Sequence, residues 1–477
     1  MEAKDYDDGF FSIKDDCGFN PPEEPLTKLP DEYHILQDVL DHLPFWLDKE
    51  IEKKGILGEE GRIVVEVRRI PNYVDRIKTI NTTDKTQQPL FAALFRGYAF
   101  LTSAYLLEPT YHEKLKTGNY GKARDVLPIN LAEPFCYVAE TLGVHPWLDY
   151  GYAYSLGNRL KKDPSGGLNW ENLDMCVKFT GTKDEIGFIM VHVDINSRSG
   201  SLVKSIFDFQ RALKESNAVK RTKLLTEALK LNYQTMKEIN KRRWEMWKAS
   251  DHTKYDDFRP FIMGSKGNEE IFGEGVIYEG VWDEPVVFRG QTGAQDNIIP
   301  SEDIFTGIVE FYPKNKLTEY LLDLREYRPK IFREFLSDLY ETSKGNLQTV
   351  LESGNKEGMV YYLGSIEEVY RFRHGHWQFV QKYIMANTKY AKATGGTPVT
   401  TWVPNQIEAT LNAMGLVLQK IAETEGELSK EANEIYQPLK EDFKDKCNSL
   451  EKQVKELSKD IFDTGLVFDL NEKFKEV

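Results

Sequence analysis

Histidine offers the most informative chemistry in this sequence, because only eight histidines occur in 477 residues. His374 and His376 stand at what we predict to be the start of a helix whose later face is apolar. A histidine on such a face is either a core residue with a hydrogen-bond partner or a metal ligand. Helical residues two apart diverge by about 200°, so this pair cannot share one ion. No zinc motif accompanies them, whereas a single axial histidine can hold haem.

Two further residues stand out for their surroundings. His192 ends the apolar run Gly187–His192, so it is either a helix-end residue or a polar group lining an apolar small-molecule pocket. Arg259 stands among aromatic residues. It either forms a structural salt bridge with Asp256 or Asp257, or holds a substrate carboxylate with its bidentate guanidinium.

The segment Thr394-Gly395-Gly396-Thr397 is a glycine-rich loop that matches neither GxxxxGK[ST] nor GxGxxG. A nucleotide site is therefore poorly supported. The loop is either an ordinary connection or a mobile lid whose hydroxyls and backbone N–H groups close over a ligand.

The elements that must position these residues are mostly helical. Apolar residues recur at helical spacing in several segments, and proline and glycine mark the loops between them. Gly61–Val67 is the exception, since it is β-like and predicts a minor sheet at most. The predicted helices cover Leu90–Leu107, Leu202–Leu213, Leu225–Ile239, Leu317–Leu339 and Ser365–Asn387.

Composition narrows the class of protein. The net charge of −14 argues against nonspecific nucleic-acid binding and against docking on anionic lipid. The most apolar stretch, Leu90–Leu107, contains Arg96 and is expected to be a buried helix rather than a membrane span. Four cysteines without a CxxC pair and an N-terminus without an apolar run favour a reducing, cytoplasmic location.

The expected fold is mainly α, with a small helical domain followed by a large one. The predicted divisions are an N-terminal surface arm (1–30), a small helical domain (31–179), a large domain (180–407) and a helical C-terminal extension (408–477). The lysine- and glutamate-rich extension is either a partner surface or, as we favour, a set of helices packed on the body. Pro438 is expected to interrupt it.

Taken in order, several short segments resemble the indoleamine 2,3-dioxygenase family over roughly residues 30 to 405. Each segment is weak by itself, and their order and spacing together are specific. They include His145-Pro146-Trp147-Leu148, Arg259-Pro260-Phe261, Ile277-Tyr278-Glu279-Gly280-Val281-Trp282, Leu324-Arg325-Glu326-Tyr327-Arg328-Pro329, His376-Trp377-Gln378-Phe379-Val380 and Thr394-Gly395-Gly396-Thr397.

The resemblance implies a haem b oxidoreductase with haem in the large domain. His376 resembles the proximal iron ligand, and Arg373 and Asp303 resemble the charge pair beside it. The small-residue loop over the haem corresponds to Gly293 and Ala294.

The family inserts both atoms of O2 across the indole C2–C3 bond of L-tryptophan, giving N-formylkynurenine in the kynurenine pathway. The implied partners are L-tryptophan or a related indole, O2 and an electron donor that reduces ferric haem. We expect a monomer. Arg259 resembles the carboxylate-binding arginine, and His192 would orient the indole or restrain its N–H. The other implied substrate contacts are Tyr255, Phe188, Tyr150, Thr292, Gly293, Thr394, Gly395, Gly396 and Thr397.

The sequence also departs from the family pattern. Serine is familiar at the position of His192, where histidine is reminiscent of the tryptophan 2,3-dioxygenases, in which it contacts the indole N–H. Gln291 replaces a small residue, Lys254 an aromatic one and Ser265 a tryptophan. Two alternative functions follow: the same haem fold acting on another indole derivative, or a low-activity haem-binding or signalling protein.

Overall fold

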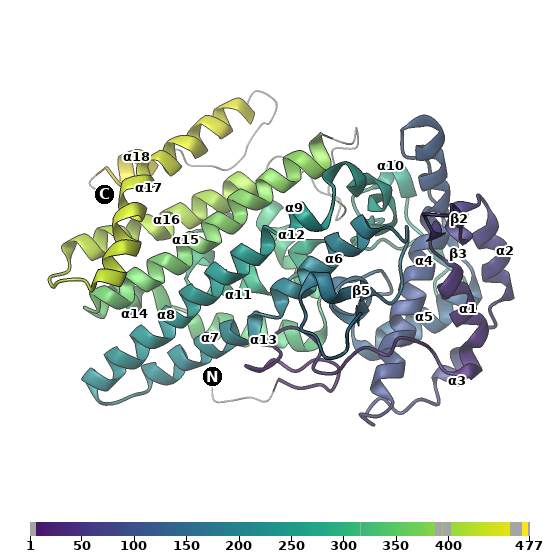
Figure 1. The fold of residues 1–477 in the computed structure, drawn as a ribbon, viewed down its shortest axis with the longest axis horizontal. Coiled ribbons are helices and arrows are strands. Elements are labelled where there is room, and N and C mark those ends of the chain that lie inside the picture. The colour runs from purple at the N-terminus through teal and green to yellow at the C-terminus, as the bar shows by residue number, and fades with distance from the viewer. Residues whose placement is uncertain (1–5, 315, 387–393, 395–401, 458–469, 476–477) are drawn as a thin grey trace.

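The chain was analysed as a computed structural model that describes residues 6–314, 316–386, 394, 402–457 and 470–475. Its architecture is helical, as the sequence predicts (Figure 1). The first helices are α1 (His34–His42), α2 (Arg62–Arg69), α3 (Val74–Ile77), α4 (Gln88–Thr117) and α5 (Ile129–Leu142). They are followed by α6 (Lys183–Asn196), α7 (Ser199–Leu213), α8 (Ala218–Arg243), α9 (Met246–Ala249), α10 (Glu269–Phe272), α11 (Ile298–Phe305), α12 (Lys316–Asp323), α13 (Lys330–Ser343), α14 (Asn346–Glu352), α15 (Lys356–Phe379), α16 (Trp402–Glu423), α17 (Lys430–Leu457) and α18 (Leu470–Lys473).

Strands are short and form three two-stranded pairs among the described residues. β1 (Trp46–Asp48) pairs antiparallel with β2 (Lys53–Lys54), and β4 (Arg159–Lys161) pairs antiparallel with β5 (Leu173–Met175). β3 (Val126–Leu127) and β6 (Ile277–Tyr278) are parallel, with Val126 opposite Ile277. This last pair joins segments that are far apart in the sequence.

α4 is the central helix of the N-terminal part. It is apolar on most of its circumference, and by length and composition it would be able to cross a membrane. However, 83% of its most apolar window is buried within the protein. A helix that is apolar all round belongs in a core when other elements surround it. The prediction of a buried helix at Leu90–Leu107 is thereby confirmed.

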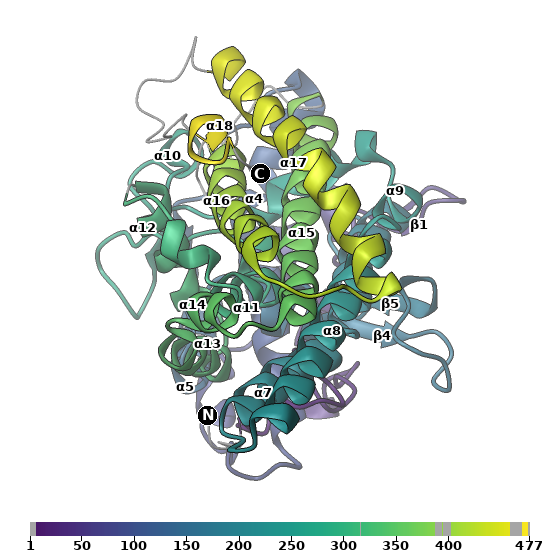
Figure 2. The same ribbon diagram turned by 90° about the vertical axis from the view of Figure 1, so that its left-hand side faces the viewer.

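Long helices running side by side form the second part of the molecule (Figures 1 and 2). α8 packs on both α7 and α15, and α16 lies along α15. The predicted stripe Leu225, Leu229, Met236 and Ile239 is buried on α8. Periodic burial of this kind is what makes a long amphipathic helix stable, since helix propensity alone contributes little.

The prediction of a β-like segment at Gly61–Val67 is wrong, because these residues begin α2. β-branched residues suggested a strand, but Ile63 and Val67 are four residues apart and both are buried on one helical face. Packing of that face against α4 overrides the local preference.

Proline acts differently from expectation at two places. The predicted helix Leu317–Leu339 is divided into α12, a 3₁₀ turn and α13, with Pro329 immediately before α13. Pro438, expected to interrupt the tail, lies inside α17. Burial of one face of α17 holds the helix together despite the missing N–H.

The C-terminal helices pack on the body, which is the alternative we favoured. α17 contacts both α15 and α16. The predicted boundary at residue 408 falls inside α16, and this division stays a prediction. The other domain divisions stay predictions. The buried side chains of α17 are Ala432, Tyr436, Leu439, Phe443, Cys447 and Leu450.

The N-terminal arm is not the surface segment that its polar composition suggested. Phe11 and Phe19 are buried, and both rings pack against Phe332 of α13. Widely spaced aromatic residues give no periodic pattern, so their burial is decided by the hydrophobic surface that they meet.

We expect Phe11→Ala to lower the free energy of unfolding by about 3 kcal/mol or more, because it leaves a cavity beside Phe332 and Tyr152. Urea denaturation followed by circular dichroism measures the loss. Asp16→Ala is the control, since this neighbouring side chain is exposed. Equal stability of the two variants would show that the arm is dispensable.

Candidate functional site

His376 lies in the last turn of α15, immediately before a π-helical turn at Val380–Met385. We expected it at the start of a helix. The expected helix start is wrong, although the predicted helix Ser365–Asn387 already includes the turns before His376; α15 begins at Lys356. His376 is thus fixed on a rigid helix, close to the point where the α-helix passes into the π-helical turn.

The His376 side chain is accessible, although protein atoms surround it. Burial lowers its pKa to about 4, and the charge of Arg243 and the nearness of His192 act in the same direction. The imidazole is neutral at pH 7, which is the form that ligates a metal.

His374 points elsewhere. Its ring stacks on Tyr370 with centroids 5.9 Å apart and an interplanar angle of 11°. Within the described ranges, no group of three or more His, Cys, Asp or Glu side chains is placed to hold a metal ion. A single histidine that holds haem needs no such group, so the prediction for His376 stays a prediction.

A buried ion pair secures α15 one turn before His376. Arg373 Nη2 donates to Asp303 Oδ2 of α11 at 2.6 Å, and both side chains are almost fully buried. Tyr312 donates to the same carboxylate, and Arg373 also donates to Thr410 of α16. The predicted charge pair is present. Its role beside an iron ligand stays a prediction.

His192 stands on α6 with aromatic rings around it. Its ring centroid lies 5.8 Å from that of Phe188 and 5.7 Å from that of Tyr150. Phe188 in turn packs against Tyr255 at 4.8 Å and Tyr383 at 5.8 Å. Burial lowers the pKa of His192 to about 4, so this ring is also neutral at pH 7. His192 therefore lies among aromatic rings, and its role in lining a small-molecule pocket stays a prediction.

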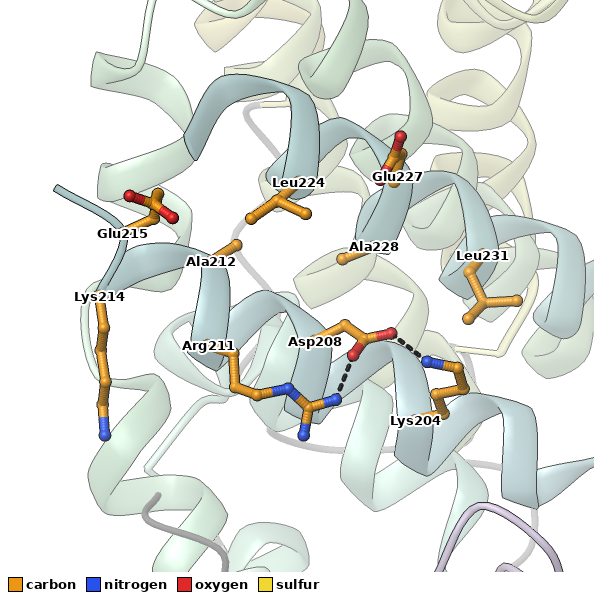
Figure 3. Close-up of a pocket in the computed structure, with 10 residues that line it drawn as sticks. All are labelled: Lys204, Asp208, Arg211, Ala212, Lys214, Glu215, Leu224, Glu227, Ala228 and Leu231. Atoms are coloured by element: carbon orange, nitrogen blue, oxygen red, sulfur yellow. Dashed lines mark hydrogen bonds and ion pairs between the residues drawn. The ribbon is translucent and has the colours of Figure 1, made fainter. Parts of the chain in front are cut away.

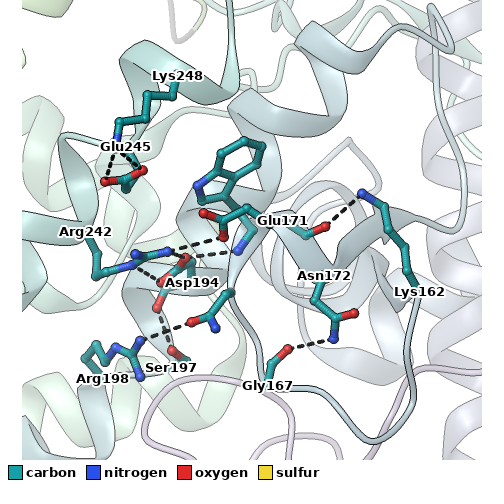
Figure 4. A network of polar contacts seen from close by, with 12 residues as sticks. Lys162, Gly167, Glu171, Asn172, Asp194, Ser197, Arg198, Arg242, Glu245 and Lys248 are labelled. Carbon is teal, nitrogen blue, oxygen red and sulfur yellow. Dashed lines mark hydrogen bonds and ion pairs between the residues drawn. The ribbon is translucent and has the colours of Figure 1, made fainter.

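On the side of α6 away from His192, polar contacts hold the helix in place. Asp194 is fully buried and accepts from Arg242 Nε at 3.0 Å and from the Trp170 backbone N–H at 3.0 Å (Figure 4). The hydrogen bond to Asp194 is the main cause that raises the pKa of Arg242. α6 is thereby tied to the end of α8 and to the segment before β5.

The loop at Thr292–Ala294 faces His192. Gly293 and Ala294 are exposed, and a Cβ added to Gly293 would meet only His192 Cε1, at 3.3 Å. The loop is held from behind by Arg328, whose Nη2 donates to the carbonyl oxygens of Ala294 and Asp296 at 2.8 and 3.1 Å. Glycine at 293 therefore lets the loop approach the histidine ring closely, because a side chain there would press on that ring.

Thr394 borders the same loop. Its Oγ1 donates to the Gln291 carbonyl at 2.8 Å, and its own carbonyl accepts from the Gly264 N–H at 3.0 Å. The structure thus places Thr394 beside Gln291, and its contact with a substrate stays a prediction. Gly395, Gly396 and Thr397 lie outside the described residues, and the lid hypothesis stays a prediction.

Arg259 is completely buried next to this aromatic group. Its Nη1 donates to Tyr120 Oη at 3.1 Å and lies 4.0 Å from Asp256 Oδ1. It also interacts electrostatically with Tyr255. The structural ion pair with Asp256 is present, as one alternative predicted, and the position beside Tyr255 is compatible with the carboxylate-binding alternative.

Four residues of this region were not predicted as site residues: Tyr383, Tyr120, Arg328 and Arg243. Tyr383 was only part of an apolar helix face, and it lies in the π-helical turn. Tyr120 and Arg328 carry no local pattern, because their partners are distant in the sequence. Arg243 ends a basic run on α8 that reads as a solvated helix terminus.

An open cavity elsewhere is a poor candidate. It lies between α7 and α8, has a volume of about 580 Å³ and carries a mixture of charges (Figure 3). Lys204 and Arg211 both bind Asp208 there. The residues around it include no aromatic ring or histidine, so it lacks the groups that would position an apolar ligand.

Comparisons with known sequences identify the family of this chain. The family model described as indoleamine 2,3-dioxygenase matches residues 8–432. The chain belongs to the indoleamine 2,3-dioxygenase family. It is 28% identical to indoleamine 2,3-dioxygenase 1 of Rattus norvegicus over 419 residues, covering 85% of this chain and 95% of the rat protein. It is 26% identical to indoleamine 2,3-dioxygenase of Saccharomyces cerevisiae over 428 residues, with 86% and 87% covered.

The family consists of haem-dependent enzymes, and this chain is an enzyme of the same dioxygenase type. The residues present fit haem. A neutral, accessible imidazole can ligate iron at His376, and the small residues Gly293 and Ala294 are exposed on the side of His192. The family match covers all of α16, the helix that contributes Thr410 to the contact with Arg373.

Glu302, beside Asp303 on α11, should make the stability of the protein depend on pH. It is fully buried, burial raises its pKa to about 8, and it accepts from Asn232 Nδ2 at 2.7 Å. The folded protein keeps this acid neutral while the unfolded chain ionises it near its usual pKa of 4.5. Its contribution to stability is complete below that value and is lost as the pH rises toward 8.

We therefore expect Glu302→Gln to flatten the fall in stability between pH 5.5 and 8. The wild type should lose on the order of 1 kcal/mol per pH unit from this group. Urea midpoints at several pH values measure the difference, with the exposed Glu274→Gln as control. Parallel pH profiles of wild type and Glu302→Gln would contradict an ionisation coupled to folding.

Proposed function

We propose that the protein binds haem b through His376 and opens the indole C2–C3 bond of L-tryptophan with O2, giving N-formylkynurenine. The observation that carries the proposal is the neutral, accessible imidazole of His376, which stands within electrostatic reach of His192 and its aromatic neighbours. Family membership supports the same cofactor and reaction type.

His376 would hold the iron, and the Arg373–Asp303 pair would keep α15 in place beneath it. When bound, haem supplies the activation of O2, which no protein side chain provides. The remaining requirements fall on the chain itself. It must exclude water, set the plane of the indole ring and fix the amino-acid end of the substrate.

Phe188 and Tyr255 can set the indole plane, because their adjacent rings present apolar faces near His192. The neutral His192 has one ring nitrogen free of a proton, and that nitrogen can accept a hydrogen bond from the indole N–H. In this role His192 orients the substrate or restrains the N–H, and no strong general base is required.

Arg259 would bind the substrate carboxylate. It is a cation next to Tyr255, so the aromatic contact and the charge contact can act on opposite ends of one amino acid. An arginine–carboxylate contact in a buried site has both the strength and the direction to select an α-amino acid.

The wider setting is part of the same proposal. We place the enzyme in the cytoplasm as a monomer that acts in tryptophan catabolism through the kynurenine pathway, with a separate electron donor for ferric haem. The net charge of −14 supports the absence of nucleic-acid and anionic membrane partners.

A second candidate function is the same reaction on another indole derivative. Lys254, which replaces an aromatic residue of the family pattern, is exposed and supplies no ring to the pocket. Gln291 is buried beside Thr394, where a small residue is usual. Both differences change the pocket wall rather than His376. Comparing L-tryptophan, D-tryptophan and tryptamine as substrates distinguishes the two functions.

Spectra of the purified protein in the ferric and ferrous–CO states, with and without L-tryptophan, test the proposal. We expect a Soret band that changes on addition of L-tryptophan, and absorbance of N-formylkynurenine on turnover. His376→Ala should abolish the Soret band because the axial ligand is lost. His374→Ala is the matched control and should keep it, since that ring stacks on Tyr370. Haem retained by a folded His376→Ala variant would falsify the assignment.

The role of Arg259 has its own test. Arg259→Gln should raise the KM for L-tryptophan by roughly 10- to 100-fold, because a charge-assisted hydrogen bond contributes about 1.5–3 kcal/mol. Lys114→Gln removes another cation held by Asp256 at 3.0 Å and should change KM little. Tryptamine, which has no carboxylate, should be handled alike by wild type and Arg259→Gln. An unchanged KM for L-tryptophan would place the carboxylate elsewhere.

A further inference from the structure

A buried arginine stands beside the candidate iron ligand. Arg243 is the last residue of α8 and is only 3% exposed. Its guanidinium lies against the backbone of Gly375, the residue before His376. A Cβ added to Gly375 would come within 2.4 Å of both Nη1 and Nη2. Glycine at 375 is therefore what allows the cation to approach α15 so closely.

The surroundings of Arg243 are largely aromatic. Its Cζ lies 4.5 Å from the ring centroid of Trp244, 5.1 Å from that of Phe372 and 5.4 Å from that of Phe379. These rings hold the guanidinium by cation–π contact, but they do not cancel its charge.

Among the described residues, only two of the three guanidinium nitrogens of Arg243 have hydrogen-bond partners. Nε donates to Asn240 Oδ1 at 3.2 Å and Nη2 to the Arg371 carbonyl at 3.2 Å, and both acceptors are uncharged. Nη1 is buried and has no hydrogen-bond partner among the described residues. Such an unsatisfied group is costly in a core, which suggests that it has a further role.

No carboxylate of the described residues is in ion-pair distance of Arg243. Glu368 acts on it electrostatically, but its own oxygens are engaged with Arg371 at 3.7 Å and with Asn240 at 2.8 Å. Burial lowers the pKa of Arg243 to about 10, so it remains a cation at pH 7. Its positive charge also acts on the neighbouring His376 ring.

We propose that Arg243 sets the ferric/ferrous equilibrium of the haem held by His376, favouring the ferrous state. A fixed positive charge in a poorly screened interior opposes the additional positive charge of ferric iron. Removing the charge must therefore lower the reduction potential. This inference rests on the proposed haem function. It states that a residue of the protein, Arg243, favours the ferrous state of the haem, which is the state that binds O2.

Spectroelectrochemical titration of the haem-loaded protein tests the inference. Arg243→Met, which is neutral and apolar, should shift the ferric/ferrous equilibrium at least tenfold toward ferric. For a one-electron couple this is a fall of about 59 mV per tenfold. Arg243→Lys keeps the charge and should preserve most of the potential. The shift should persist in 0.5 M salt, because ions screen a buried charge poorly.

Lys241→Gln is the matched control. It removes the same charge from the same helix, but the Lys241 side chain is 77% exposed, so solvent already screens it and the potential should not move. Arg243→Gln is a second neutral variant. It keeps a donor for the Asn240 and Arg371 oxygens in case Arg243→Met does not fold.

The outcomes separate the two proposals. Absence of a Soret band in the wild type contradicts haem binding itself. Haem bound through His376 with an unchanged potential in a folded neutral variant overturns only the role of Arg243. Loss of haem from the folded neutral variants, with retention in Arg243→Lys, also overturns it and makes Arg243 a residue that binds the cofactor.

Discussion

The arrangement of the site depends on one buried ion pair, between Arg373 of α15 and Asp303 of α11. Removing two charges from water is costly, and the pair persists because Tyr312 and Thr410 add hydrogen bonds to it. These partners come from separate segments, so the pair fixes how α11, α15 and α16 meet. His376 follows Arg373 by one helical turn, and its ring inherits that position.

Burial also sets the protonation of His376 and His192. Both imidazoles are neutral because charging them inside the protein is unfavourable. Neutrality gives His376 the lone pair that a metal needs and leaves His192 able to accept from an indole N–H. Arg243 is a buried cation that retains its charge beside His376, and aromatic faces rather than a carboxylate support it. The same poorly solvated interior thus produces two neutral imidazoles and one fixed charge.

Much of the site could be predicted from residue types. His376 and His192 were singled out as histidines in apolar runs, and Arg259 as an arginine among aromatic residues. The resemblance to a family added the Arg373–Asp303 pair and the Thr292–Ala294 loop, and the structure brings each of these pairs or loops together. The residues that hold the site from behind, such as Arg328 and Tyr120, were missed because their partners are far away in the sequence.

By itself the sequence determined the helical class, the buried α4 and the α7–α8 pair, because helical periodicity is a local property of the chain. It did not determine that Gly61–Val67 is helical, that Pro438 is tolerated in α17 or that Phe11 is a core residue. Those outcomes follow from the apolar surfaces that each segment meets. Only the tertiary structure brings His376, His192 and Arg243 within reach of one another, since the electrostatic and packing energies that join them act between helices distant in the chain.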